Sequence, residues 1–191
     1  MLIVLTLSED EVRRRDDIAE DLISRIALGE TSAMGELYEL IGRDVFSYAL
    51  AKTTDKENAE DVTHDTFVKV WKYAAQYTPA GKPLAWIFTI EINLIRRLYN
   101  KSKRFVPLEE AIEVEFDGDS FAEKIVNNEF LRQMLNSLND EERTIVALHI
   151  VSGLKHREIA RLLDKPLSTV LSKYNRSIKK LQTLVKEKEE H

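Results

Sequence analysis

The sequence predicts an all-α fold, arranged as two small helical domains joined by an acidic linker. Apolar residues recur at helical spacing through most of the chain, and runs of β-branched residues are short. Glycine and proline, which interrupt helices, number only 6 and 4 among 191 residues. A chain of this length can bury the core of one large domain or of two small ones.

Four helices are expected before the linker. Their predicted ranges are 17–28, a segment from Thr31 or Ser32 to Leu50, 56–76 and 83–103. Thr31 or Ser32 is expected to cap the second helix, and Pro83 fits the first turn of the fourth. Together these helices predict a compact domain over residues 17–104, preceded by an N-terminal extension at residues 1–16.

The predicted linker, residues 105–127, is strongly acidic. Glutamate and aspartate recur through it against a single lysine. High charge of one sign with little periodicity favours an extended, mobile tether. The same composition could also act as an acidic surrogate that occupies a nucleic-acid channel.

The last segment, residues 128–191, has the pattern of a helix-turn-helix domain. The stretch Asn-Asp-Glu-Glu at 139–142 is a helix-start signature, and Gly153 is a suitable helix stop. Pro166 then separates a short second helix from a long helix over residues 167–186. This order of elements predicts a domain that places one helix in a DNA groove.

The long helix presents a polar, basic face opposite its apolar one. Short hydroxyl, amide and basic side chains on an exposed helix suit the major groove, because they donate to phosphates and base edges. The face contains Ser168, Ser172, Lys173, Asn175, Arg176, Lys179 and Lys180. The alternative is a small helical bundle whose basic face is only solvated.

Charge divides the chain into two unlike parts. The net charge is −5, yet residues 132–191 hold 12 basic and 8 acidic residues, against 16 and 25 in residues 1–131. A basic module is therefore attached to an acidic one. The absence of cysteine excludes a disulfide framework, thiolate catalysis and Cys-ligated zinc, and fits a reducing cytoplasm. The apolar start, residues 1–7, is too short for a signal peptide or a membrane span.

The third predicted helix has an acidic face with apolar residues in it or at its edge. Asp61 and His64 have the spacing of a di-iron motif, but that motif needs a second carboxylate-x-x-His on a facing helix, and the sequence offers none. A protein-docking face and a plain solvated face remain the two interpretations. The docking face would hold Asp61, Asp65, Phe67, Val68 and Trp71.

The fourth predicted helix carries a line of polar residues on an otherwise apolar helix. The line runs through Thr89, Asn93, Arg96, Arg97, Asn100 and Arg104. Tyr77 and Trp86 flank a Gly/Pro loop that ends at Lys82, and aromatic groups beside basic ones suit the capture of unstacked bases. The alternative is that the aromatics belong to the core and the basic residues only solubilise the helix end.

Motifs in both halves of the chain match a known family. In the first half they are residues 22–30 (LISRIALGE), 59–67 (AEDVTHDTF), 85–87 (AWI) and Asn93. In the second half they lie within residues 138–181, at Glu158-Ile159-Ala160, Pro166, Thr169-Val170 and Ser172. They closely resemble regions 2 and 4 of the extracytoplasmic-function sigma factors of bacterial RNA polymerase, in the sigma-70 superfamily.

The resemblance implies a role in transcription initiation, with no enzyme activity, no cofactor and no catalytic or metal site. Region 2 of the family binds the β′ clamp of core RNA polymerase and recognises the minus-10 element, whereas region 4 binds the β flap and reads the minus-35 element. The positions implied to face polymerase are Asp61, Asp65, Phe67, Val68 and Trp71. The positions expected to contact promoter DNA are Asn93, Arg96, Arg97, Trp86, Lys82, Ser168, Thr169, Ser172, Lys173, Asn175 and Arg176. An anti-sigma protein is a further implied partner, and no membrane insertion is expected.

Four positions depart from the family pattern. Arg97 stands where an acidic or amide residue is usual, and Leu171 where a basic residue is usual. Ser168 replaces a common glycine, and Lys155 replaces the usual Ser/Thr cap. These changes imply an unusual promoter, or weaker DNA affinity offset by polymerase binding.

Two other functions compete with the sigma-factor interpretation. A one-component helix-turn-helix regulator would bind duplex DNA alone as a dimer, whereas a sigma factor would be a monomer with feeble duplex affinity. A helical metal-dependent hydrolase would lose activity on chelation, and the missing second ligand set counts against it.

Overall fold

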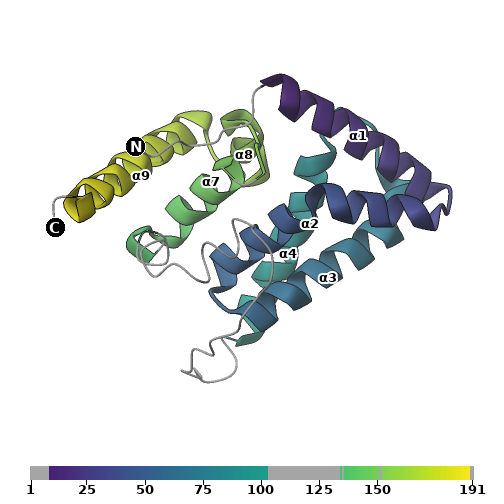
Figure 1. The fold of residues 1–191 in the computed structure, drawn as a ribbon, viewed down its shortest axis with the longest axis horizontal. Helices are drawn as coiled ribbons and strands as arrows, with labels where there is room; N and C mark the ends of the chain where they lie inside the picture. The colour runs from purple at the N-terminus through teal and green to yellow at the C-terminus, as the bar shows by residue number, and fades with distance from the viewer. Residues whose placement is uncertain (1–8, 103–133, 135, 151, 190–191) are drawn as a thin grey trace.

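The computed structural model describes residues 9–102, 134, 136–150 and 152–189 (Figure 1). Every regular element in these ranges is a helix, which confirms the predicted all-α fold. The predicted linker, residues 105–127, lies outside the described residues.

The amino-terminal module, residues 9–102, is a helical bundle arranged around its second helix (Figure 1). Its elements are α1 (Glu9–Ala27), α2 (Thr31–Thr53), α3 (Lys56–Tyr73), the 3₁₀ turn η1 (Ala74–Gln76) and α4 (Pro83–Ser102). Helix α2 packs against α1, α3 and α4. Leu37, Ile41 and Val45 are buried on α2, and their spacing of four residues places them on one side of the helix.

The first helix begins earlier than predicted. Helix α1 starts at Glu9 rather than at Asp17, so it includes part of the stretch that the sequence suggested as an extension. Acidic residues 9–11 favour the amino end of a helix, where they face the positive end of its dipole. The three arginines that follow have high helix propensity.

The predicted cap of α2 at Thr31 or Ser32 is wrong. The N-cap residue is Glu30, whose side chain makes no cap hydrogen bond. The Arg25 guanidinium holds the Glu30 carboxylate at 2.5 Å, and the Ser32 hydroxyl donates to the same carboxylate at 2.8 Å. The ion pair therefore fixes this turn in place of a hydroxyl cap.

The carboxy-terminal module, residues 134–189, has the predicted helix-turn-helix order. Its helices are α7 (Asp140–Ile150), α8 (His156–Leu162) and α9 (Leu167–Glu189). The helix-start signature is confirmed as a capping box: Asn139 Oδ1 accepts from the Glu142 amide at 2.9 Å, and the Glu142 carboxylate accepts from the Asn139 amide at 3.1 Å. Gly153 has φ of 71° in the turn after α7, a conformation that favours glycine.

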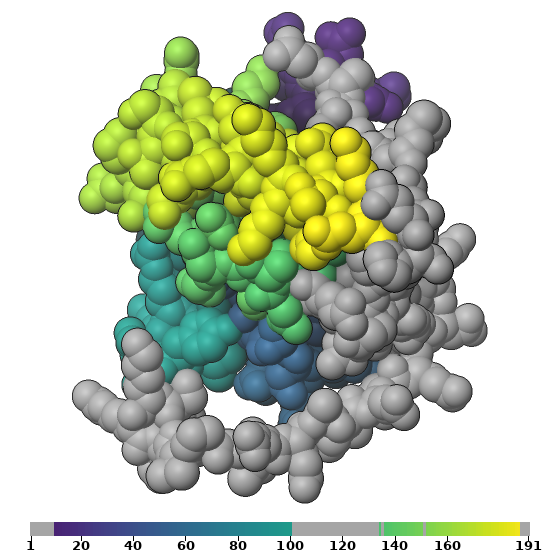
Figure 2. Space-filling model, turned by 90° about the vertical axis from the view of Figure 1, so that its left-hand side faces the viewer, coloured from purple at the N-terminus to yellow at the C-terminus, as the bar shows by residue number. Residues whose placement is uncertain are grey.

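The two modules pack against each other, with α7 on α2 and α8 on α4. Figure 2 shows α7, in green, between the yellow surface of α9 and the teal and blue surfaces of the amino-terminal module. Several buried apolar residues of α7 and α8, among them Ile145 and Ile159, belong to the same continuous core as Leu37 and Phe88. Contact between the modules is therefore apolar as well as polar.

Helix α4 buries a carboxylic acid in this core. Glu91 is fully buried, and neither of its carboxyl oxygens has a hydrogen-bond partner. Burial raises the pKa of Glu91 well above its usual range, and the backbone of Ala49 lowers that pKa only in part. The neutral, protonated acid is thus the favoured form, and it still carries polar atoms into an apolar environment.

Replacing Glu91 with leucine is expected to stabilise the protein. The substitution Glu91→Leu removes unsatisfied polar atoms at nearly constant volume, so the free energy of unfolding should rise by about 1–3 kcal/mol. Urea unfolding followed by circular dichroism measures this change. The control Glu91→Gln keeps a buried polar group and should show no comparable gain, whereas a loss of stability in Glu91→Leu would contradict the prediction.

Candidate nucleic-acid and partner interfaces

The outer face of α3 combines acidic and apolar side chains. Asp61 and Asp65 are exposed, and Val68 and Trp71 remain 50% and 42% exposed. Phe67 differs from this set, because it is buried beneath Tyr38 of α2 with ring centroids 4.9 Å apart. We call Asp61, Asp65, Val68, Trp71 and Tyr38 the α3 face.

Tyr38 is a residue of this face that sequence reasoning did not select. It is 52% exposed and comes from a different helix, so the periodicity of α3 alone could not reveal it. Phe67, which was selected, supports the face from below. Exposed apolar groups set among acidic ones are typical of a protein-docking surface.

The part of the polar line predicted on α4 that the structure describes, from Thr89 to Asn100, is exposed, and Arg104 lies outside the described residues. Asn93, Arg96 and Arg97 all lie at the surface of that helix. Trp86 is half-buried near the start of α4, and its ring packs on Tyr77 with centroids 5.0 Å apart. The aromatic pair therefore serves partly as core, as the alternative interpretation held, while part of Trp86 stays accessible.

The loop between η1 and α4, residues 77–82, is held by acidic residues from two other helices. Glu20 of α1 accepts hydrogen bonds from the Tyr77 hydroxyl at 3.4 Å and from the Gly81 amide at 3.3 Å. Glu158 of α8 accepts one from Lys82 Nζ at 2.7 Å. Neither glutamate was expected to contact the loop, because contacts between distant segments leave no local pattern in a sequence.

A third acidic residue, Asp16 of α1, interacts with this junction. Burial, and after it the nearby Glu158 carboxylate, raise the pKa of Asp16 to about 6, although Arg15 and Lys82 oppose the shift. An ionised Asp16 therefore carries an energetic cost in the folded protein. The junction brings α1, the loop and α8 together.

The polar face of α9 is mostly accessible. Ser168, Ser172, Asn175 and Arg176 are exposed, and Thr169 is half-buried. Lys173, also expected on this face, is instead paired with Glu141 of α7 at 2.8 Å. Lys165 pairs with the same carboxylate at 2.9 Å, and these two lysines lower the pKa of Glu141.

A basic depression next to α9 was not predicted. It has a volume of 540 Å³ at the turn from α8 to α9, and Arg157, Arg161 and Lys165 line it. The two arginines lie four residues apart on α8 and are exposed. That spacing is visible in the sequence and could have indicated the basic patch.

Three rings pack together where α7, α8 and α9 meet. His149 and His156 have centroids 4.2 Å apart, and Tyr174 packs on them at 4.9 and 4.5 Å. Burial, and then the neighbouring His149, lowers the pKa of His156. The cluster joins the turn of the helix-turn-helix to the helix that carries the polar face.

The described residues offer no group of three or more side chains placed to hold a metal ion. Asp61 and His64 lie on the exposed side of α3. Within the same residues, no helix is long and apolar enough to cross a membrane.

The fold and these faces define a two-module helical protein of the helix-turn-helix class. Comparison with known families makes the assignment specific. Residues 37–105 match Sigma-70 region 2, and residues 130–181 match Sigma-70, region 4. The chain belongs to the sigma-70 family of RNA polymerase sigma factors, in its extracytoplasmic-function (ECF) group, and is thus a protein that directs transcription initiation.

Several curated relatives carry the same assignment. The ECF RNA polymerase sigma factor BldN of Streptomyces coelicolor is 28% identical over 86% of this chain, which spans 65% of BldN. ECF RNA polymerase sigma factor SigK of Mycobacterium ulcerans is 26% identical over 88% of this chain and 94% of SigK. RNA polymerase sigma factor YlaC of Bacillus subtilis is 26% identical over 81% of this chain and 94% of YlaC.

Solved structures share the fold. CnrH, in complex with the cytosolic domain of CnrY, matches with a TM-score of 0.67 and 24% identity, over 89% of this chain and 98% of CnrH. The sigma factor RpoE of Bartonella quintana, in complex with the anti-sigma factor NepR, matches with a TM-score of 0.62 and 19% identity, over 80% of this chain and 96% of RpoE. The predicted family and fold are confirmed, and the roles of individual residues stay predictions.

The substitution Asp16→Asn is expected to stabilise the protein only where Asp16 is ionised. Because folding raises the pKa of Asp16 to about 6, stability is lost as pH rises from about 4 to 6, and asparagine avoids this loss. After discounting for partial exposure, the gain at pH 7.5 should be about 1 kcal/mol. Urea unfolding at pH 4, 5, 6 and 7.5 measures it.

The exposed neighbour provides the control for this experiment. Asp17→Asn removes the same charge at an exposed position of α1, and because Asp17 raises the pKa of Asp16 less than burial does, it should change stability much less than Asp16→Asn. A gain in Asp16→Asn that is equally large at pH 4 would contradict the assignment, because Asp16 would then act by something other than its ionisation.

Proposed function

We propose that this sigma factor binds core RNA polymerase through the α3 face and reads promoter DNA with two separate surfaces. The observation that supports the proposal is the presence of three exposed faces on three different helices. The face on α3 is acidic and apolar, whereas those on α4 and α9 are polar and basic. Each face lies on a rigid helix, so each can engage a different partner at the same time.

The amino-terminal module would contact the β′ clamp and the minus-10 element. Asp61, Asp65, Val68 and Trp71 supply charge and apolar area for the clamp, with Phe67 supporting them and Tyr38 extending the same face. Asn93, Arg96, Arg97, Trp86 and Lys82 would contact the minus-10 strand. The half-buried Trp86 offers a ring on which an unstacked base can lie.

The carboxy-terminal module would contact the β flap and the minus-35 element. Ser168, Thr169, Ser172, Asn175 and Arg176 would enter the major groove from α9. Lys173 needs to leave Glu141 before it can reach DNA. In this proposal the two functional units are residues 17–104 and residues 128–191, as predicted from the sequence. Residues 105–127 join them.

An anti-sigma protein is a further partner in this proposal. CnrH and RpoE were solved with the cytosolic domain of CnrY and the anti-sigma factor NepR. The α3 face leaves Tyr38, Val68 and Trp71 each more than 40% exposed, and an anti-sigma protein would cover such groups. We propose that the chain acts in the cytoplasm, without enzyme activity or a cofactor of its own.

Transcription with sigma-free core polymerase tests the function directly. Genomic fragments are transcribed with and without this chain, and the RNA 5′ ends are sequenced. New start sites preceded by two shared motifs, about one and a half to two helical turns apart, are the expected result. No new starts, together with duplex binding by the free chain as a dimer, would indicate a one-component regulator instead.

Two substitutions should separate polymerase binding from promoter choice. Asp61→Arg reverses a charge in the α3 face, and should reduce core-polymerase affinity by at least about tenfold because like charges at an interface cost several kcal/mol. Arg176→Ala should spare polymerase binding and lose about 1–3 kcal/mol of promoter discrimination. Fluorescence titration with core polymerase and start-site sequencing measure the two effects.

Each substitution has a matched control on the same module. Asp21→Arg makes the same charge reversal on an exposed part of α1, and Lys186→Ala removes a cation from the far end of α9. Both controls should behave as the unaltered chain. If Asp61→Arg changed promoter choice and Arg176→Ala abolished polymerase binding, the division of labour would be reversed.

A further inference from the structure

The depression at the turn from α8 to α9 has a basic rim and an apolar floor. Its volume is 540 Å³. Three cations, Arg157, Arg161 and Lys165, line it against one carboxylate, Asp164, and the remaining lining residues are apolar. Exposed apolar area that is surrounded by charged groups is typical of a surface that binds protein.

The two arginines of the rim are available to another molecule. Arg157 and Arg161 lie on successive turns of α8, and both are exposed. Among the described residues, neither guanidinium has an ion pair or a hydrogen bond. Each guanidinium therefore keeps its donors free for a carboxylate, which it can bind through two parallel hydrogen bonds.

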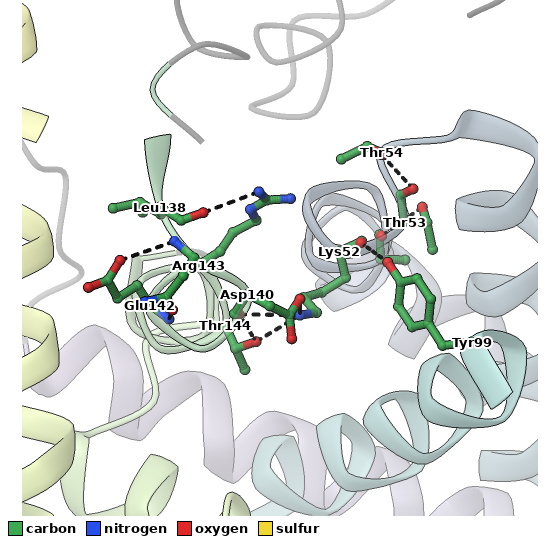
Figure 3. A network of polar contacts seen from close by, with 11 residues as sticks. Lys52, Thr53, Thr54, Tyr99, Leu138, Asp140, Glu142, Arg143 and Thr144 are labelled. Carbon is green, nitrogen blue, oxygen red and sulfur yellow. Dashed lines mark hydrogen bonds and ion pairs between the residues drawn. The ribbon is translucent and has the colours of Figure 1, made fainter. Parts of the chain in front are cut away.

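The carboxylates of neighbouring elements are engaged elsewhere. Asp140, at the start of α7, pairs with Lys52 of α2 (Figure 3). Glu141 pairs with Lys165 of the rim, and Glu158 of α8 pairs with the loop before α4. These carboxylates therefore do not neutralise the two arginines in the part of the chain that the structure describes.

The turn that carries the depression is well ordered by backbone hydrogen bonds. The Lys165 amide donates to the Ala160 carbonyl at 2.8 Å, and the Thr169 amide donates to the Pro166 carbonyl at 3.0 Å. Asp164 has φ of 52°, the left-handed conformation that often ends a helix. A surface that is already held in one shape loses little conformational freedom when it binds a partner.

The depression lies beside the surface proposed for DNA binding, but its chemistry suits protein better. Pro166 and Leu167 line it directly before Ser168, where the polar face of α9 begins. A protein bound to DNA next to the site of α9 would therefore come close to it. A DNA backbone would use only the arginines, whereas a protein segment with acidic and apolar side chains would use the rim and the floor.

We propose that the depression rimmed by Arg157 and Arg161 is a docking site for an acidic segment of a second protein, which is bound to DNA next to the minus-35 element and recruits this sigma factor. The segment places carboxylates on the two arginines and an apolar side chain over Pro166 and Leu167. Binding of the segment concerns the free chain alone, whereas recruitment to a promoter rests on the proposed function.

Two synthetic peptides test the surface. One alternates glutamate and leucine, and the other carries serine in place of each leucine. In fluorescence anisotropy titrations, the glutamate–leucine peptide should bind the unaltered chain several-fold more tightly, because only leucine gains by contact with the apolar floor. Equal affinities for the two peptides, or no binding of either, would overturn the proposal.

Removal of the two guanidinium charges should weaken binding of the glutamate–leucine peptide. The double variant Arg157→Gln, Arg161→Gln loses two exposed ion pairs with the peptide, so its affinity should fall about fivefold. The matched control Arg13→Gln, Arg14→Gln removes the same charge from exposed positions of α1 and should bind as the unaltered chain does. An equal fall in both variants would show attraction by net charge only, and the docking site would be wrong.

Duplex binding distinguishes this surface from a further DNA contact. If Arg157 and Arg161 bound phosphates, the double variant would bind duplex DNA more weakly, and the slope of its salt dependence would fall by about one for each arginine. We expect the slope of the unaltered chain instead. A reduced slope would assign the two arginines to DNA and overturn the proposal.

Recruitment is measured in the transcription assay with a tethered peptide. The glutamate–leucine peptide is fused to a DNA-binding protein whose operator lies just upstream of the minus-35 element. The fusion should raise initiation several-fold with the unaltered chain but not with the Arg157→Gln, Arg161→Gln variant. Equal stimulation of both chains, or of neither, would overturn recruitment through this surface. If the chain supported no transcription even without the fusion, the proposed function would fail, while the peptide titrations would still decide the docking site.

Discussion

The enclosure of the carboxyl end of α2 is the constraint on which the arrangement of both modules depends. Six consecutive residues there, Ser47 to Lys52, are buried. A helix that packs on one side buries only every third or fourth residue, so consecutive burial requires neighbours on all sides. Helices α1, α3 and α4 cover most of α2, and α7 of the other module covers what remains. The end of α2 is therefore completed by a segment that lies far away in the sequence.

This enclosure has an energetic cost as well as a benefit. Packing of apolar residues such as Ile145 against the amino-terminal core favours the docked arrangement. Burial of the Lys52 ammonium opposes it and lowers the pKa of Lys52. Its partner Asp140 is 79% exposed, so the attraction between them is weakened by water. The contact is therefore less stable than its apolar burial alone would make it.

Local sequence patterns predicted the helices well, because their causes are local. The capping box of Asn139 and Glu142, the exposed and buried sides of α3, and the break at Pro166 each depend on residues within a few positions of one another. Long-range contacts have no such signature. Periodicity placed Lys173 on the polar face of α9, yet its flexible side chain reaches Glu141 of α7, and nothing in the sequence indicates that Glu20 holds the loop. Glu91, the one acidic residue within the apolar run of α4, was visible but its complete burial was not.

The two surfaces that we propose for DNA binding differ in how the contact between the modules affects them. On the amino-terminal module, Lys82 is paired with Glu158 and Arg96 lines the cavity beside α7, so docking engages the surface itself. On α9, Asn175 and Arg176 are exposed, and the only bond described for the Arg176 guanidinium is to the backbone carbonyl of Ser172 in its own helix. Contacts of α9 with a major groove therefore do not compete with docking through these side chains.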